Sequence, residues 1–318
     1  MRIPHLPHRG IAPAVDPSPD RHRQGLITTL QTLIALIAFA ANSVLCRMAL
    51  GNGAIDAASF TSVRLLSGAV TLLVILLLSG GRSSAWSTGG WLSPFLLAAY
   101  AIAFSFAYLT LSTGTGALIL FGSVQMTMIL WALRSGERPS RFEWAGLLLA
   151  FAGMAYLVSP GFEAPSFGGA FLMAVAGVSW GFYTVRGRGR SNPLAATTGN
   201  FILAVPFALA TSALTFRSVE LSTSGLVLGI LSGSLASGCG YVVWYAALRH
   251  LTSTRAAVVQ LSVPMIAAMG GVLFVSEAVS FRLVLSSVLI LGGVGLAIGG
   301  RRPKGTNPEE LLPKSTEI

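Results

Sequence analysis

Ten apolar runs, each about as long as a membrane-spanning helix, dominate this sequence. A helix needs roughly 20 mostly apolar residues to cross the hydrocarbon core of a bilayer. None of the runs shows the alternating pattern of an outer-membrane barrel, so helices are expected rather than strands. The expected spans are residues 26–46, 57–78, 91–111, 114–133, 142–159, 167–186, 194–215, 223–246, 253–275 and 281–300. The sequence therefore predicts an all-α polytopic membrane protein with ten transmembrane helices.

The composition excludes most other classes of protein. Of the 318 residues, 53% are hydrophobic and 10% are charged, whereas soluble domains carry roughly 25% charged residues. A soluble enzyme, a collagen-like chain and a disordered protein do not fit these values. The net charge of +10 would suggest nucleic acid in a soluble protein. Here the basic residues lie between apolar runs, so we expect them to meet the surface of a lipid bilayer, with no nucleic-acid partner.

The distribution of Lys and Arg predicts the orientation in the membrane, because these residues are concentrated in cytoplasmic loops. Of the 21 Lys and Arg residues, 17 lie on the side of the N-terminus. Three lie on the opposite side, Arg47, Arg217 and Arg282, and Arg64 lies within a span. We therefore expect a multi-pass protein of a bacterial inner (plasma) membrane with both termini in the cytoplasm.

Both ends of the chain are expected to be polar cytoplasmic tails. Residues 1–25 are rich in Pro and Arg and are expected to be disordered, and residues 301–318 form the second tail. An alternative for the first span is a signal peptide, since residues 26–37 are followed by the cleavage-like sequence Ala38-Phe39-Ala40. Against this alternative, the apolar run continues to Leu50.

The two halves of the chain resemble each other. A shift of 140 residues places residues 135–140 on 275–280 and Gly153 on Gly293, and a shift of 141 places Phe39 on Trp180. The expected organisation is a first repeat over 26–159, a linker over 160–166 and a second repeat over 167–300. Each repeat has five spans, and because five is odd the second must enter the membrane from the opposite side. Such inverted repeats are found in many secondary transporters, with substrate sites near the midplane between the copies.

Short motifs at equivalent places in the two halves carry a family resemblance. They are Ala41-Asn42-Ser43, Arg47, Arg64, Ser135-Gly136-Glu137, Gly146, Gly153, Ser179-Trp180-Gly181, Ser276-Glu277, Gly292 and Gly293. On these residues the chain resembles the drug/metabolite transporter (DMT) superfamily in its ten-helix form, built from two EamA-type domains. One departure is the pair Phe39-Ala40, where such proteins often carry Trp-Gly in the first span. The resemblance implies transport of a small molecule.

The ionisable residues argue against an enzyme. All eleven Asp and Glu residues fall in tails, loops or span ends, and the four His residues lie in the N-terminal tail or at a span end. No metal-ligand cluster, no ATP-binding loop and no nucleophile–base pair is present in the sequence. We therefore expect no cofactor. Transport is expected to be downhill, exchange-type or coupled through the charge of the substrate itself.

Arg64 is a cation within the second span, where charges are costly and usually mark function. It is a candidate to meet a substrate carboxylate or to line the outward vestibule. Two structural roles stay open: its guanidinium reaches the nearby membrane surface, or it bonds the carbonyls of a helix end.

Aromatic residues recur at helical spacing inside three spans. Tyr and Trp usually favour the membrane interfaces, so their place in mid-span suggests a water-accessible cavity, with packing as the alternative. Buried amides in apolar runs, Asn42, Gln125 and Gln260, suggest either substrate contact or bonds between helices. Together with Arg64, the expected substrate-binding residues are Asn42, Tyr100, Phe104, Tyr108, Gln125, Trp180, Tyr183, Tyr241, Trp244, Tyr245 and Gln260.

The function expected from these features is secondary transport of small metabolites such as amino acids, in the direction of export. Alternating access through a central aromatic-lined cavity is the expected mechanism. The alternative within the same superfamily is a transporter of drugs, organic cations or nucleotide-sugar-like metabolites. A single chain holds both repeats, so a monomer is compatible with this expectation.

Overall fold

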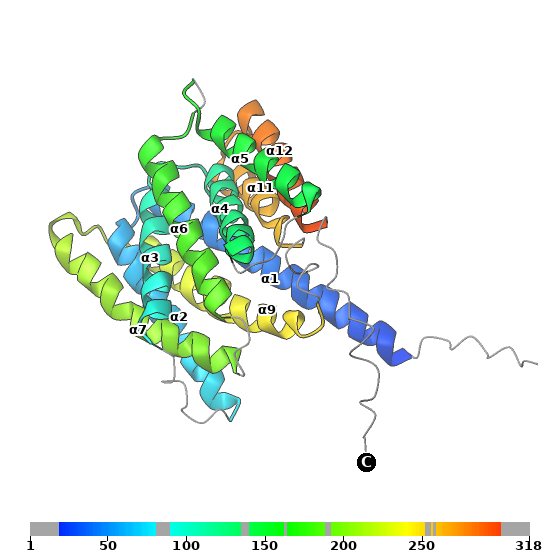
Figure 1. Cartoon of the computed structure of the whole chain (residues 1–318). Helices are drawn as coiled ribbons and strands as arrows, with labels where there is room; N and C mark the ends of the chain where they lie inside the picture. Colours follow the sequence, from blue (N-terminus) through cyan, green and yellow to red (C-terminus); the bar gives the residue numbers. More distant parts are fainter. Residues whose placement is uncertain are drawn as a thin grey trace, which may run out of the picture.

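The structure, a computed structural model, describes residues 19–80, 90–134, 140–161, 164–187, 192–251, 256 and 259–299. It is a bundle of helices (Figure 1). The helices of the first half are α1 (Pro19–Gly51), α2 (Ala57–Leu78), α3 (Leu92–Ala107), α4 (Thr113–Arg134) and α5 (Arg141–Val158). Those of the second half are α6 (Phe167–Gly187), α7 (Pro193–Leu214), the short η2 (Phe216–Ser218), α8 (Thr223–Leu231), η3 (Ser232–Cys239), α9 (Gly240–Leu248), α11 (Val263–Val275) and α12 (Phe281–Gly299).

Ten spans are present within the described ranges, as the sequence predicts. Eight helical stretches there are long and apolar enough to cross a membrane, and α8, η3 and α9 together make one of them, Thr223–Leu248. Two shorter apolar helices, α3 and α11, complete the set. At about 1.5 Å per residue, the 16 residues of α3 are shorter than a bilayer core of about 30 Å.

Four helix boundaries differ by four or more residues from the expected spans. Two are helix ends: α1 ends at Gly51 rather than at 46, and α3 ends at Ala107 rather than at 111. The first helix begins at Pro19 rather than at 26, because a helix can continue past the membrane with polar residues in its first turns. Residues 19–25, expected as part of a disordered tail, thus lie in α1. The rest of the two expected tails, 1–18 and 301–318, lies outside the described residues.

The ninth span is expected from residue 253, but α11 begins only at Val263. Pro264 stands in the first turn of α11, where its missing N–H costs no hydrogen bond, so it opens this helix instead of bending it.

Local signals in the sequence explain several helix starts. Asp56 caps α2, since its Oδ1 accepts hydrogen bonds from the backbone N–H groups of Ala58 (3.1 Å) and Ser59 (2.9 Å). Ser140 and Glu143 form a reciprocal capping box at the start of α5. These caps satisfy backbone donors that have no partner within their own helix.

The packing of the helices relates the two halves by a two-fold exchange. Equivalent helices are α1 and α6, α2 and α7, α4 and α11, and α5 and α12, with α3 matching the span of α8, η3 and α9. Helix α1 packs against α11, and the equivalent helix α6 packs against α4. Helix α3 packs against α6, and the equivalent helix α9 packs against α1. Helices α2 and α7 contact each other, as do α5 and α12. With five spans in each copy, this exchange makes the two repeats inverted.

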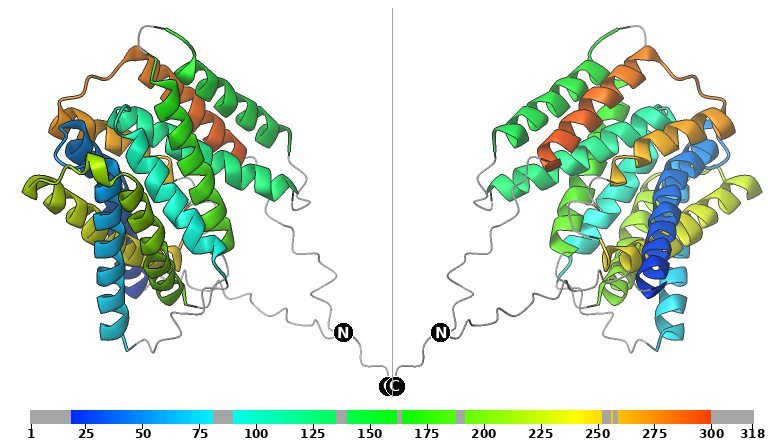
Figure 2. Two further views of the ribbon diagram at one scale, coloured as in Figure 1. Left: turned by 90° about the vertical axis from the view of Figure 1, so that its left-hand side faces the viewer. Right: turned by 90° about the vertical axis from the view of Figure 1, so that its right-hand side faces the viewer.

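The pair α5 and α12 lies side by side at one edge of the bundle (Figures 1 and 2). A Cβ atom on Gly153 would lie 2.9 Å from Ile290, and one on Gly293 would lie 2.6 Å from the backbone nitrogen of Ala150. Position 150 corresponds to 290 at the same shift of 140 that matches Gly153 to Gly293. The two glycines therefore make exchanged contacts, which is the pattern expected of a two-fold axis.

Large apolar side chains cover much of the outside of the bundle. On α2, Leu66, Val70 and Leu77 are more than half exposed, while Leu65 and Leu72 on the opposite face are buried. A soluble protein rarely exposes such a surface, whereas lipid tails cover it without cost. The exterior is thus suited to a bilayer, and the polar side chains discussed below lie inside.

Candidate functional site: a cavity between the repeats

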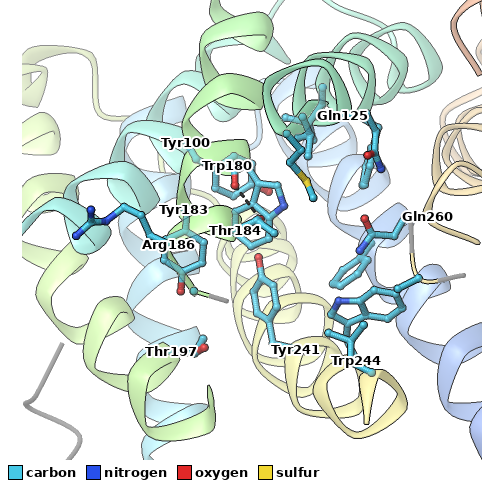
Figure 3. A pocket seen from close by; sticks show the side chains of 18 of the residues that line it. Tyr100, Gln125, Trp180, Tyr183, Thr184, Arg186, Thr197, Tyr241, Trp244 and Gln260 are labelled. Carbon is cyan, nitrogen blue, oxygen red and sulfur yellow. Dashed lines mark hydrogen bonds between the residues drawn. The ribbon is translucent and has the colours of Figure 1, made fainter. Parts of the chain in front are cut away.

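A cavity of about 500 Å³ lies between the two halves (Figure 3). Its walls come from α1, α3 and α4 of the first half and from α6, α7, α9, α12 and the segment between α9 and α11 of the second. Pockets that hold small molecules commonly have volumes of roughly 300–1,000 Å³ and combine apolar walls with a few polar groups. The cavity therefore has the size for one small metabolite.

Aromatic rings line the cavity in a two-fold arrangement. The rings of Tyr100 on α3 and Trp180 on α6 lie 4.9 Å apart, centroid to centroid. The rings of Phe39 on α1 and Tyr241 on α9 lie 5.8 Å apart. A shift of 141 converts Phe39 into Trp180 and Tyr100 into Tyr241, so the second pair is the first one exchanged between repeats. Trp180 also lies 5.4 Å from Tyr241, which connects the two pairs into one aromatic wall.

Several polar groups of the cavity wall have spare hydrogen-bonding capacity. The Nε2 of Gln125 is buried without a hydrogen-bond partner among the described residues. Asn200 donates from Nδ2 to the hydroxyl of Tyr183 (3.2 Å), while its buried Oδ1 accepts no hydrogen bond within the described ranges. An unmade hydrogen bond of a buried group costs about 1–3 kcal/mol, so these amides favour a polar solute.

A buried polar cluster lies behind one wall of the cavity. Arg64 of α2 is 2% exposed and donates from Nη2 to the hydroxyl of Tyr100 (2.9 Å). It therefore reaches neither the surface nor a helix-end carbonyl, the two structural roles that the sequence left open. The side chains of Asn42, Ser232 and Ser237 join the same region through hydrogen bonds with one another.

The cavity extends to one end of the bundle. Its lining includes Arg186 and Gly187 from the last turn of α6, Pro193 from the first turn of α7 and Leu248 from the last turn of α9. Figure 3 shows Arg186 in the lining near Tyr183. Because α6 ends and α7 begins there, this end is the one at which α1 begins, and we name it the open end.

Contacts between the repeats cover the opposite end, which we name the closed end. Ile55, between α1 and α2, forms an antiparallel backbone bridge with Leu221, between η2 and α8. The backbone N–H of Asp56 donates to the carbonyl of Glu220 over 3.0 Å. These hydrogen bonds join the α1–α2 connection of one repeat to the η2–α8 connection of the other.

An ion pair adds to the closed end. Arg47 of α1 and Glu277, just after α11, lie 3.1 Å apart between Nε and Oε1. The Oε2 of Glu277 accepts the backbone N–H of Thr113 at the start of α4 (2.8 Å), and the Nη1 of Arg47 donates to the carbonyl of Tyr108 (3.0 Å). Glu277 therefore forms an ion pair with α1 and also caps the first turn of α4. Its counterpart Glu137 lies outside the described residues.

The structure brings together ten of the twelve side chains that the sequence singled out, in the lining of one cavity. They are Asn42, Tyr100, Phe104, Gln125, Trp180, Tyr183, Tyr241, Trp244, Tyr245 and Gln260. Arg64 and Tyr108 are not in the lining. The ring of Tyr108 lies behind Phe104, with centroids 4.8 Å apart, and its hydroxyl donates to the carbonyl of Thr113 (3.3 Å).

The lining also contains residues that the sequence reasoning missed, among them Phe39, Arg186 and Asn200. Asn200 is an amide inside an apolar run, so the signal that marked Asn42 could have found it. Phe39 falls on Trp180 at the shift of 141, so that match could have found it. Arg186 carried no separate signal, because it reads as one of the basic residues at a span end.

Comparison with known proteins agrees with this architecture. The EamA-like transporter family matches residues 26–159 and again 167–299. An uncharacterized protein of Pseudomonas aeruginosa is 47% identical over 283 residues, which cover 89% of this chain and 96% of that protein. An uncharacterized transporter of Archaeoglobus fulgidus is 33% identical over 209 residues, which cover 61% of this chain and 70% of the relative.

The fold also has a solved counterpart. A crystal structure of a protein with 18% sequence identity superposes with a TM-score of 0.63 and covers 87% of this chain and 98% of its own. Ten helical spans, an internal cavity and two family matches lead to one assignment. The chain is a multi-pass membrane protein that belongs to the EamA-like transporter family of the DMT superfamily, and it is a transporter rather than an enzyme.

Proposed function

We propose that this protein is a secondary transporter that exports small metabolites such as amino acids, by alternating access through the central cavity. The observation that carries the proposal is the two-fold aromatic wall between the inverted repeats, formed by Phe39, Tyr100, Trp180 and Tyr241. A site on the axis between two inverted repeats faces either side of the membrane when one repeat rocks against the other.

The polar lining supports a solute the size of an amino acid. Aromatic faces offer stacking and apolar contact, and the amides of Gln125 and Asn200 offer unused donor and acceptor groups. The cavity volume of about 500 Å³ leaves room for one such solute. No Asp or Glu residue lines the cavity in the described part of the chain. We therefore propose exchange, downhill movement or coupling through the solute's own charge, rather than proton relay by a carboxylate in the cavity.

We also propose that the open end faces the cytoplasm of a bacterial cell. The 17 Lys and Arg residues on that side, against three on the other, support this orientation. The cavity would then be loaded from the cytoplasm, the direction that export requires. One chain encloses the whole cavity, so transport by a monomer is part of this proposal.

Counterflow in proteoliposomes tests the proposed function. Purified protein is reconstituted with a high internal concentration of one amino acid, and uptake of the same labelled amino acid is followed across a panel. We expect accumulation for at least one amino acid above protein-free liposomes. If every amino acid fails while a labelled organic cation accumulates, the alternative of drug or organic-cation transport replaces the proposal.

Substitutions of two tryptophans test whether the transported solute binds in this cavity. Trp180→Ala and Trp244→Ala each remove an aromatic face from the lining, and we expect the half-saturation concentration to rise roughly three- to tenfold. Trp144→Ala is the matched control, because Trp144 lies half-exposed on α5, outside the lining. Unchanged kinetics in both cavity variants would contradict the role of the aromatic wall.

A further inference from the structure

Arg64 is a buried charge without an acidic partner among the described residues. Its side chain is 2% exposed and lies in the apolar helix α2. The carboxylates in the described part of the chain serve elsewhere or stand at helix ends: Asp20 lies in the first turn of α1, Asp56 and Glu143 cap helices, Glu277 pairs with Arg47, and Glu220 is exposed at the closed end. An uncompensated charge inside a membrane protein is costly, and such residues usually mark a substrate or ion pathway.

Neutral groups occupy only part of the guanidinium. Nη2 donates to the hydroxyl of Tyr100 (2.9 Å), and Nε lies 3.4 Å from the Oγ of Ser237. The ring of Phe104 lies under the guanidinium, 4.8 Å from its central carbon. The third nitrogen, Nη1, is buried and has no hydrogen-bond partner within the described ranges. Arg64 can thus bind an anion through Nη1 and Nη2 when the neutral hydroxyl of Tyr100 leaves Nη2.

A stretch of π-helix supplies polar neighbours at this depth of the membrane. The segment η3 widens the eighth span between α8 and α9, and π-helical turns are frequently found at functional sites. Within it, Ser232 donates to the Oδ1 of Asn42 (2.7 Å), and Ser237 accepts from the Nδ2 of Asn42 (3.1 Å). The serines hold Asn42 and Arg64 in one buried cluster.

One layer of side chains separates Arg64 from the cavity. Asn42, Tyr100 and Phe104 line the cavity, and both rings also contact the guanidinium. Arg64 has no counterpart in the second repeat, because the shift of 141 places Val205 at the equivalent position. The repeat alone therefore does not explain why an arginine stands here. The charged residue that the described lining does contain, Arg186, is also a cation.

We propose that Arg64, with Asn42 and Tyr100, forms a subsite for the carboxylate of the transported solute. The carboxylate takes the place of the Tyr100 hydroxyl on Nη2 and also accepts from Nη1, the side-by-side geometry that a guanidinium offers to a carboxylate. The aromatic wall then holds the apolar part of the same solute. This inference rests on the proposed function and narrows its substrates to carboxylates and zwitterions, excluding amines without a carboxylate.

A set of probes with one common ring tests the subsite on the wild-type protein in lipid nanodiscs. The probes are 3-phenylpropanoate, phenylalanine, phenylalaninamide and phenethylamine, and binding is followed by tryptophan fluorescence. We expect the first two to bind at least tenfold more tightly than the amide and the amine, since hydrogen bonds to a charged group are the strong ones. Equal or tighter binding of the amide or the amine would overturn the subsite.

Substitutions of Arg64 supply a second, independent test. Arg64→Gln should weaken binding of 3-phenylpropanoate at least tenfold and leave that of phenylalaninamide unchanged, and Arg64→Lys should retain part of the preference. Arg217→Gln is the matched control, because Arg217 is an exposed arginine near the closed end. Wild-type affinity of Arg64→Gln for 3-phenylpropanoate would overturn the proposal. If Arg64→Gln does not fold, the wild-type probe series alone decides.

Counterflow with the same four compounds separates this inference from the proposed function. Counterflow that favours the amine or the amide would overturn the carboxylate subsite and leave transport standing. If binding shows the carboxylate preference but none of the four compounds is transported, the subsite stands and the proposed transport of amino-acid-like solutes fails.

Discussion

Glu277 holds three helices together at the closed end through its two carboxylate oxygens. One oxygen pairs with Arg47 at the end of α1, and the other accepts the first backbone N–H of α4. Both side chains of the ion pair are partly buried, with 23% and 14% of their surface exposed. Because the pair keeps some access to water, it is suited to a contact that must form and break.

Glu277→Gln is expected to loosen the closed end. The buried thiol of Cys46, one residue before Arg47, reports on this change when Cys239 is replaced by Ser. Loss of an ion pair worth about 1 kcal/mol corresponds to about fivefold faster labelling of Cys46 by a maleimide. The control is Glu220→Gln, which removes an exposed carboxylate from the same end of the molecule. Equal labelling rates in Glu277→Gln and the control would show that the pair does not hold this end closed.

The spacing of aromatic residues predicted much of the cavity wall, because steps of four place Tyr100 and Phe104 on one helix face. The partners of Arg64 could not be predicted in this way. Ser232 and Ser237 reach the guanidinium region from a π-helix, whose wider turn changes which residues share a face. The α-helical period of the sequence does not predict which residues share a face in a π-helical segment.

Helices α5 and α12 approach each other closely. A Cβ on Gly146 would meet the backbone carbonyl of Gly293, and the backbone and side chain of Ala297. Small residues at such a crossing let two membrane helices approach closely. Not every glycine of α12 lies in this contact. Cβ atoms on Gly292 and Gly299 would contact nothing within 4 Å in the described part, and the contact face of α12 carries Gly293 instead.

Gly146→Ala and Gly292→Ala are expected to change stability in opposite directions. The first methyl group collides with the backbone of α12, and such overpacking costs about 1–3 kcal/mol. The second lies in open space, where Ala favours a helix over Gly by up to about 1 kcal/mol. Thermal unfolding of the purified proteins should show a midpoint several degrees below wild type for Gly146→Ala, and at or above it for Gly292→Ala. The reverse order would contradict the assigned face.

At the scale of the whole molecule, two copies of one motif enclose the cavity while only one end of the bundle is open. The number of spans and the inverted relation could be predicted, because apolar length and an odd count of helices leave little freedom. Which end is closed could not be predicted. Exchanged copies make both ends similar in sequence, and the choice depends on a few contacts such as those of Ile55 with Leu221 and Arg47 with Glu277.

The distances across the two ends of one molecule test the central claim, that the cavity opens alternately to each side. In protein without native cysteines, spin labels at Asn52 and Val219 span the closed end, and labels at Gly187 and Arg249 span the open end; all four positions are exposed. The distance between the two labels of each pair is then measured by double electron–electron resonance, with and without the amino acid that gives counterflow. We expect that amino acid to lengthen distances in the first pair and shorten them in the second. Distances that stay constant, or that change in the same direction at both ends, would contradict alternating access.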